Sequence, residues 1–163
     1  MVLPAELWEN WINMNGIRPA QLTDAAAIEA IIQPYIDDFA VDNMGRQCLN
    51  YQSILKVLGL ADVEYFVYSD AELIIGAIAY QKPAHLLHFF VDQRYQHQGV
   101  GKKMWQFVEN KIRAENILAV TVNSSCYAEK IYQHFGFMPT QSVIEDRGLR
   151  FIPMKKTYLS NNT

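Results

Sequence analysis

The sequence contains little cysteine, no long apolar run and no excess of basic residues. Its two cysteines, Cys48 and Cys126, lie far apart and outside any Cys-x-x-Cys pair, which argues against a zinc site or a redox motif and predicts reduced thiols. The formal net charge is −3, whereas a protein that binds nucleic-acid backbones without sequence preference needs a basic excess. No segment approaches the ~20 apolar residues that span a bilayer, and the first residues lack the basic region of a secretory signal. We therefore expect a cytoplasmic protein with no metal site and no nucleic-acid or membrane partner.

Repeats, low-complexity tracts and long linkers are also absent from the sequence, so we expect one domain. Of the 163 residues, 50% are hydrophobic and 19% are charged, as is ordinary for a globular protein. We place a single domain at residues 15–159, an extension at 1–14 and a tail at 160–163. Trp8, Trp11 and Ile12 have helical spacing, which predicts a short helix that packs either on the domain or on a second subunit of a homodimer.

Helical spacing is typical of the first third of the domain, and strands follow it. Thr23 and Asp24 are expected to cap the first helix, which Pro34 ends. Helices are predicted near 24–32, 35–42, 51–58, 98–114 and 128–135. Strands are predicted near 17–19, 64–69, 73–81, 85–91, 118–122, from 137 onward and at 151–158. Consecutive hairpins favour a mixed α/β sheet over a doubly wound nucleotide-binding fold, and the apolar run at 85–91 predicts a strand buried on both faces.

The segment at 91–101, VDQRYQHQGVG, carries the strongest chemical signal. Gly99 and Gly101 open a long helix whose apolar side carries Val100, Met104, Phe107, Val108 and Ile112. Glycines let backbone N–H groups approach a ligand closely, and the unpaired N–H groups and dipole at a helix N-terminus attract a pyrophosphate. The spacing is neither the GxGxxG of dinucleotide-binding folds nor a P-loop. On spacing alone, a tight strand-to-helix turn without a ligand is the alternative.

Two motifs in this sequence resemble those of one enzyme family. Gln96-x-x-Gly99-x-Gly101 after an apolar strand is similar to the acyl-CoA-binding signature of the GNAT superfamily of N-acetyltransferases. A second segment resembles the family's V-N-(A/S)…A-x-x-x-Y-x-x-x-G-F pattern and consists of residues 122–125, Ala128, Tyr132, Gly136 and Phe137. The order of the expected elements also fits. The resemblance implies an α/β fold with a mixed, mostly antiparallel sheet of about six or seven strands, flanked by helices and splayed at its central parallel strand pair.

The resemblance also implies acetyl-CoA as the co-substrate. Backbone N–H groups of residues 98–102 would bind the pyrophosphate, and the backbone of Phe90 and Val91 would pair with the pantetheine arm. The N–H group of Val91 would also stabilise the oxyanion of the tetrahedral intermediate. Ser125 stands where many relatives carry asparagine, which leaves its role open. The implied cofactor-binding residues are Phe90, Val91, Gln96, Gln98, Gly99, Val100, Gly101, Lys102, Asn123, Ser125, Ala128 and Tyr132.

Tyr132 occupies the position of the family's general acid, where a phenol would protonate the departing CoA thiolate. A tyrosine that only packs on the sheet is the alternative. His85 occupies the position where many relatives carry a glutamate base, and a histidine with a pKa near ~6.5 suits that role at neutral pH. His88 is the second candidate base and points to the opposite face by strand alternation, unless a bulge intervenes. Ordered water that carries the proton away is the third candidate.

The substrate is expected to lie between the helices at 35–58 and the turn at 145–150. Asp37, Asp38 and Asp42 form either an acidic rim that favours a cationic amine or a solvated helix face. The implied function is transfer of an acetyl group from acetyl-CoA to a primary amine of a small molecule or peptide, by direct attack in a ternary complex. One alternative is an acyl-CoA-binding regulatory module without turnover. Another is acetylation of a charged tRNA or a ribosomal protein, of which the acidic balance disfavours the tRNA.

Overall fold

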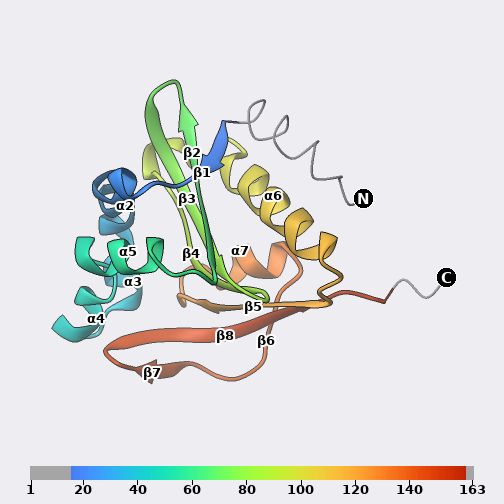
Figure 1. Ribbon diagram of the computed structural model, residues 1–163. Coiled ribbons are helices and arrows are strands. Elements are labelled where there is room, and N and C mark those ends of the chain that lie inside the picture. The colour runs from blue at the N-terminus through green and yellow to red at the C-terminus, as the bar shows by residue number, and fades with distance from the viewer. Residues whose placement is uncertain (1–15, 161–163) are drawn as a thin grey trace.

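A computed structural model describes residues 16–160, and in this part of the chain eight strands form one sheet. The strand order is β1-β2-β3-β4-β5-β8-β6, and β7 pairs with β8 beside that path. Only β4 and β5 pair in parallel, so the predicted mixed, mostly antiparallel sheet is confirmed (Figure 1). The strands are β1 (Ile17–Pro19), β2 (Val63–Asp70), β3 (Leu73–Gln81), β4 (His85–Val91), β5 (Ala119–Ser124), β6 (Met138–Pro139), β7 (Ile144–Asp146) and β8 (Leu149–Thr157).

Helices cover both faces of the sheet, as Figure 1 shows. One face carries α2 (Ala25–Ile32), α3 (Ile36–Phe39), α4 (Asn43–Gln47) and α5 (Tyr51–Leu58). The opposite face carries α6 (Val100–Ala114) and α7 (Glu129–His134). Short 3-10 turns lie before α2, before α3 and after β4, and they are η1 (Leu22–Asp24), η2 (Gln33–Tyr35) and η3 (Gln93–Tyr95).

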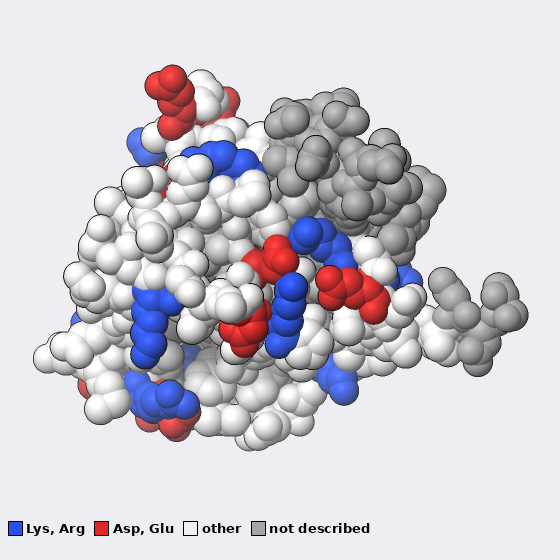
Figure 2. Space-filling model, in the orientation of Figure 1, with Lys and Arg blue, Asp and Glu red and all other residues white. Residues whose placement is uncertain are grey.

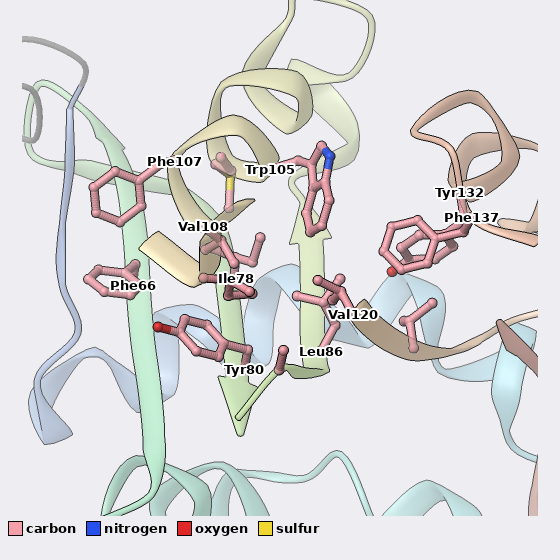
Figure 3. Close-up of a cluster of buried hydrophobic side chains, with 14 of the residues drawn as sticks. Phe66, Ile78, Tyr80, Leu86, Trp105, Phe107, Val108, Val120, Tyr132 and Phe137 are labelled. Atoms are coloured by element: carbon pink, nitrogen blue, oxygen red, sulfur yellow. The ribbon is translucent and has the colours of Figure 1, made fainter. Parts of the chain in front are cut away.

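Two hydrophobic cores lie on the two faces of the sheet. On the α6 face, Phe66 and Phe107 meet edge to face with their ring centroids 4.8 Å apart, and Trp105 packs against Phe137 (Figure 3). The predicted apolar side of the long helix is confirmed, because all of its five residues are buried: Val100, Met104, Phe107, Val108 and Ile112. On the other face, Ile28 and Ile32 of α2 pack with Ile54 of α5. The sheet therefore has buried side chains on both faces.

The helical segment predicted at 35–42 is interrupted in the structure. α3 ends at Phe39, Ala40 forms a β-bridge with Leu149, and the Val41 N–H donates to the Gly148 carbonyl at 2.8 Å. Asp42 then accepts from the Gly45 N–H at 3.0 Å and begins α4, which the sequence pattern did not predict. Pairing with the end of the β7–β8 hairpin therefore overrides the local helical preference.

The predicted cap of the first helix also differs. Asp24 is buried and accepts from the Gln21 N–H at 2.7 Å, which closes η1 before α2 begins. Both of its carboxylate oxygens also accept from the Arg18 guanidinium, at 2.8 and 2.9 Å. The Arg18 side chain is the main cause that lowers the pKa of Asp24. Asp24 thus joins β1 to the turn before α2 and makes no side-chain cap of α2 itself.

The predicted full burial of β4 on both faces is wrong. Leu86, His88 and Phe90 are buried, but the residues between them, and His85 before them, are only half-buried. A bulge lies at Leu87, because Tyr80 pairs with Leu86 whereas Ala79 pairs with His88. The physical reason for the partial exposure is that β4 has β5 as a neighbour over only two residue pairs.

Several expectations concern parts of the chain that lie outside the described residues. The helix predicted around Trp8, Trp11 and Ile12 is one of them, and most of the tail at 160–163 is another. Within the described chain, both cysteines are free thiols, with Cys126 exposed. None of the helices between residues 16 and 160 is long and apolar enough to cross a membrane.

Candidate functional site

The parallel strands β4 and β5 separate after a short stretch of pairing. They are paired at His85 with Thr121 and at Leu86 with Val122, and β5 continues beside β8 while β4 continues beside β3. The backbone of residues 87–91 therefore has no strand neighbour on its β5 side among the described residues. An unpaired strand edge of this kind can bind an extended, peptide-like ligand.

The register of β4 decides which of its backbone groups face this opening. The Asp92 N–H donates to the Ile75 carbonyl of β3 at 2.8 Å, so the alternation of an antiparallel ladder turns the backbone of Phe90 toward β3 as well. The N–H and C=O groups of Phe89 and Val91 point the other way, into the opening. The backbone of Val91 therefore points into the opening, as the sequence predicted. The backbone of Phe90 does not, and Phe90 contributes its side chain to the cavity instead. Phe89, whose backbone also points into the opening, was not predicted from the sequence.

The carbonyl oxygen of Val91 already has a protein partner. The Tyr35 hydroxyl of η2 donates to it at 2.5 Å, and the Gln96 side-chain amide donates to the same hydroxyl. Gln96 thus ties the loop after β4 to η2 with its side chain. The N–H of Val91 is the backbone group that remains for a ligand at this point.

The loop that follows β4 presents a row of backbone N–H groups. His97 and Gly99 have positive φ angles of 62° and 81°, and α6 then begins at Val100. The N–H groups in the first turn of a helix have no partner inside the helix. A Cβ atom on Gly99 would meet nothing within 4 Å, and one on Gly101 would meet Val91 Cγ2 at 3.6 Å. Backbone N–H groups in such an arrangement can bind an anionic group, and pyrophosphate binding at residues 98–102 stays a prediction.

Tyr132 of α7 faces the opening from the side of β5. Its ring lies edge to face with Phe89 at a centroid distance of 6.2 Å. It also lies edge to face with Phe137 at 5.5 Å, and Figure 3 shows these two rings together. Burial raises the pKa of Tyr132, so the phenol stays protonated at neutral pH. The hydroxyl bonds to none of the described residues and is not sealed from solvent, and Tyr132 lines a cavity together with Asn123. The side chain is therefore free to donate a hydrogen bond into that cavity.

Ser125 and Ala128 form the turn that leads into α7. The Ser125 hydroxyl accepts from the Ala128 N–H at 3.1 Å, and Ser125 is buried. The carbonyl of Ala128 accepts from the Tyr132 N–H at 3.1 Å. The Ser125 side chain, whose role the sequence left open, thus holds the turn that positions Tyr132.

The cavity between the separated strands has a volume of about 160 Å³. It is bounded by β4, β5 and α7 on one side and by α3, the segment before α5 and the start of β8 on the other. Its lining residues are Phe39, Leu49, His85, Leu86, Leu87, His88, Phe89, Phe90, Val122, Asn123, Tyr132, Leu149 and Phe151. The structure thus brings the predicted acid Tyr132 and both candidate bases to one cavity.

The bulge at Leu87 places His85 and His88 on the same side of β4. Leu86 packs in the α6-side core while Phe90 packs in the opposite core, so His85 and His88 both turn away from α6. His85 Nδ1 lies 2.7 Å from Thr121 Oγ1, and burial lowers the pKa of its imidazole. His88 Nδ1 lies 2.8 Å from the Tyr65 hydroxyl, and burial lowers its pKa to about 4. Both imidazoles are therefore neutral at pH 7.

The three aspartates of the predicted substrate region have different environments. Asp37 forms an ion pair with Arg46, and Asp42 caps α4. Asp38 is half-buried and has no ion pair or hydrogen bond among the described residues, and burial raises its pKa. None of the three lines the cavity. On the face shown in Figure 2, acidic and basic side chains are interspersed.

No metal-binding cluster is found among residues 16–160, where no group of three His, Cys, Asp or Glu side chains could hold an ion. The groups described at the opening offer hydrogen bonding and proton transfer by neutral side chains. Backbone N–H groups can bind an anion at one end of the opening, and a protonated phenol faces its middle.

Comparison with known proteins gives a consistent result. The model of the acetyltransferase (GNAT) domain matches residues 29–158. A GCN5-related N-acetyltransferase from Rhodopseudomonas palustris is similar in structure, with a TM-score of 0.73, 20% identity, and coverage of 86% of this chain and 94% of that chain. The PaiA N-acetyltransferase from Thermoplasma acidophilum, solved in complex with coenzyme A, has a TM-score of 0.69, 17% identity, and coverage of 87% and 98%.

The ribosomal-protein-S18-alanine N-acetyltransferase from Escherichia coli has a TM-score of 0.66 and 15% identity, with coverage of 90% of this chain and 97% of that chain. At these identities the solved structures establish a shared fold. No curated protein matches the sequence.

Proposed function

Because the chain belongs to the GNAT family of acetyltransferases, we propose that it transfers an acetyl group from acetyl-CoA to a primary amine of a small molecule or peptide. The observation that carries this proposal is the opening between β4 and β5, into which both the Val91 backbone and the Tyr132 hydroxyl turn. A strand edge, a backbone N–H donor and a protonated phenol in one opening are what acyl transfer from a thioester requires. The domain proposed for this activity spans residues 15–159.

The co-substrate would be held mostly by backbone groups. The N–H groups of residues 98–102 would bind the pyrophosphate at the start of α6, and the edge of β4 would pair with the amides of the pantetheine arm. The position of Gly101 beside Val91 supports this path, because it leaves room where a larger side chain would stand. Asn123 and Phe90, which both line the cavity, would contact the acetyl end with their side chains.

The chemical step would be direct attack of the neutral amine nitrogen on the thioester carbonyl carbon. The N–H of Val91 would stabilise the negative charge that develops on the carbonyl oxygen. Tyr132 would donate its proton to the sulfur as the carbon–sulfur bond breaks, because the CoA thiol has a pKa near ~8.5 and the departing thiolate therefore takes up a proton at neutral pH. His85 or ordered water would accept the proton that the amine loses.

The test combines CoA binding with product formation. Calorimetry with CoA measures the first half of the proposal, and thiol release with a panel of primary amines measures the second, with acetylated product identified by mass. Micromolar CoA binding and acetylated amine are expected. If CoA binds and no amine in the panel is acetylated, the alternative of an acyl-CoA-binding regulatory module replaces the enzyme. Tyr132 favours the enzyme, because this cavity-lining phenol has no hydrogen-bond partner among the described residues and a binding module has no use for a proton donor there.

A further inference from the structure

We propose that the acceptor is a primary amine that carries one apolar group about the size of an aromatic ring and, next to the amine, an oxygen that accepts a hydrogen bond from His88. This inference rests on the proposed function and names the substrate class of the same cavity. Two independent observations support it: the hydrogen bond between the Tyr65 hydroxyl and Nδ1 of His88, and the absence of Asp, Glu, Lys and Arg from the described lining of the cavity.

The hydrogen bond between Tyr65 and His88 has a preferred direction. Tyr65 is buried, and the imidazole of His88 is its hydroxyl's partner at 2.8 Å. If Nδ1–H donated to that hydroxyl, the phenolic proton would stay buried without an acceptor, which is unfavourable. Donation from the phenol to Nδ1 avoids this cost. The proton of the neutral imidazole then resides on Nε2.

His88 lines the cavity, and its Nε2 atom has no hydrogen-bond partner among the described residues. We take Nε2 as the atom that meets a ligand, because Nδ1 is already bonded to the Tyr65 hydroxyl. The structure thus presents a fixed N–H donor that needs an acceptor atom. An amide, ester or hydroxyl oxygen satisfies this donor, whereas a second ammonium group repels it by placing N–H against N–H.

The remaining wall on this side of the cavity is apolar. It consists of Phe39, Leu49, Phe90, Leu149 and Phe151, and the rings of Phe39 and Phe90 lie 6.2 Å apart, edge to face. The whole cavity measures about 160 Å³, which is comparable to the ~150 Å³ of an apolar cavity that binds benzene. One ring-sized group fits, and its burial contributes binding energy in proportion to its apolar area.

The lack of acidic side chains in the described lining of the cavity disfavours amines that carry several positive charges, such as polyamines and aminoglycosides. The described residues that line the cavity include no Asp, Glu, Lys or Arg, and burial keeps its two histidines, His85 and His88, neutral at pH 7. Asp37 and Asp42 are engaged elsewhere, with Arg46 and with the Gly45 N–H, and Asp38, which has no partner among the described residues, does not line the cavity. A polyamine or an aminoglycoside would have to lose the hydration of its additional ammonium groups without gaining a counter-charge, which is strongly unfavourable. The lining of the cavity therefore favours a monoamine.

The experiment compares three acceptors in the thiol-release assay: phenylalaninamide, 2-phenylethylamine and spermidine. Phenylalaninamide has both the ring and the oxygen, 2-phenylethylamine has the ring alone, and spermidine has neither. Because the two aromatic amines differ in basicity, the ratio of their kcat/KM values is compared between protein variants rather than read once. Calorimetric binding of phenylalaninamide to the CoA complex gives a readout that does not depend on turnover.

Substitutions of His88 and Tyr65 test whether the Nε2–H group of His88 donates a hydrogen bond to the substrate. In His88→Leu the ratio of phenylalaninamide to 2-phenylethylamine is expected to fall about 10-fold, the value of one lost hydrogen bond, with CoA affinity unchanged. His88→Gln, which returns an N–H donor near the Nε2 position, is expected to restore most of the ratio. Tyr65→Phe should lower the ratio because the tautomer is no longer imposed. Tyr80→Phe is the matched control, since Tyr80 is an equally buried tyrosine of the α6-side core, and it should leave the ratio unchanged.

The outcomes separate this inference from the proposed function. An unchanged ratio in His88→Leu, or faster acetylation of spermidine than of both aromatic amines, overturns the inference while acetyl transfer stands. Binding of phenylalaninamide to the CoA complex without any thiol release supports the cavity assignment and overturns the proposed function. If phenylalaninamide neither binds nor reacts, the inference is wrong.

A free aromatic amide and the N-terminal residue of a peptide share this chemistry, and a phenylalanyl dipeptide amide added to the panel distinguishes the two sources.

Discussion

At the scale of single residues, the side chains around the cavity are neutral at pH 7. Burial raises the pKa of Tyr132 and lowers the pKa values of His85 and His88, so each group is held in its uncharged form. The physical cause is the same in all three, because a low-dielectric environment disfavours a charge that has no partner. Neutral groups can each donate or accept one proton, and this is the property that acyl transfer to an amine needs.

Replacement of Tyr132 by phenylalanine should separate catalysis from binding. The hydroxyl has no hydrogen-bond partner among the described residues, so its loss should leave the fold and the CoA affinity close to wild type. Turnover should fall about 10²–10⁴-fold, because the proton is needed mainly as the sulfur acquires charge in the transition state. Steady-state kinetics with a verified amine and calorimetry with CoA measure the two effects. Wild-type turnover in Tyr132→Phe would remove this residue from the mechanism.

The pH dependence of activity tests His85. As a base, this imidazole works only when unprotonated, so activity should rise with pH through its pKa and level off above it. Because burial lowers the pKa of His85, the rising limb should lie below pH 6.5, the value expected for an exposed histidine. His85→Ala should remove this limb, lower the plateau rate and leave CoA binding unchanged.

A substrate amine with a low pKa can produce a similar limb, so the variant must be measured together with the profile. His134→Ala is the control, because this histidine is exposed on α7 and does not line the cavity. If His85→Ala keeps both the rate and the limb, ordered water accepts the proton and His85 serves only to join β4 to Thr121 of β5.

At the scale of helices and strands, periodic patterns were predictable and tertiary interruptions were not. The apolar side of α6 repeats over fifteen residues, and its burial follows from that pattern alone. The break after Phe39 depends on pairing between Ala40 and Leu149, which are distant in sequence, so no local signal could show it. The bulge at Leu87 depends likewise on the register with β3. Whether His85 and His88 share a face was therefore open until that register was known.

The residues of the candidate site show the same difference between local sequence signals, which were predictable, and tertiary contacts, which were not. Gln96, Gly99 and Gly101 stood out because glycine spacing before a helix has a local chemical meaning. Tyr35 did not, although its hydroxyl donates to the Val91 carbonyl, because η2 lies far from β4 in the sequence. Phe39, Leu149 and Phe151 line the cavity from two further elements and carry no motif of their own. Their role was invisible in the sequence because it arises only when those elements meet.

The start of α6 gives a prediction at the scale of one element. Gly101→Leu should abolish CoA binding, because the added side chain extends beside Val91 into the proposed pantetheine path. The thermal midpoint should change little, since the nearest atoms to a Cβ at this position lie at ordinary contact distances of 3.6–3.9 Å. Gly101→Ala is the matched control and should retain most of the affinity. CoA binding by Gly101→Leu with wild-type affinity, measured by calorimetry, would show that the cofactor does not pass this glycine.

At the scale of the whole molecule, one sheet separates two cores that share its central strands. Ile75, Ile78 and Tyr80 of β3 belong to the α6-side core, whereas Ala77 and Ala79 of the same strand belong to the core under α2 and α5. Because β3 contributes side chains to both cores, loss of packing in one core should also disturb the side chains of β3 that pack in the other. The opening between β4 and β5 therefore lies in a molecule that should unfold as one unit.

Matched substitutions on the two faces test this coupling. Ile28 and Ile112 are both almost fully buried, at 0% and 1% exposure, but they lie in opposite cores. Ile28→Val and Ile112→Val each remove one methylene group and should each lower the free energy of unfolding by about 0.5–1.5 kcal/mol. In both variants, far-UV circular dichroism and near-UV circular dichroism should report the same single transition, shifted to a lower midpoint. Two separate transitions, or a shift seen by only one of the probes, would mean that the cores unfold independently and that the acyl-transfer opening lies at a boundary between two cooperative units.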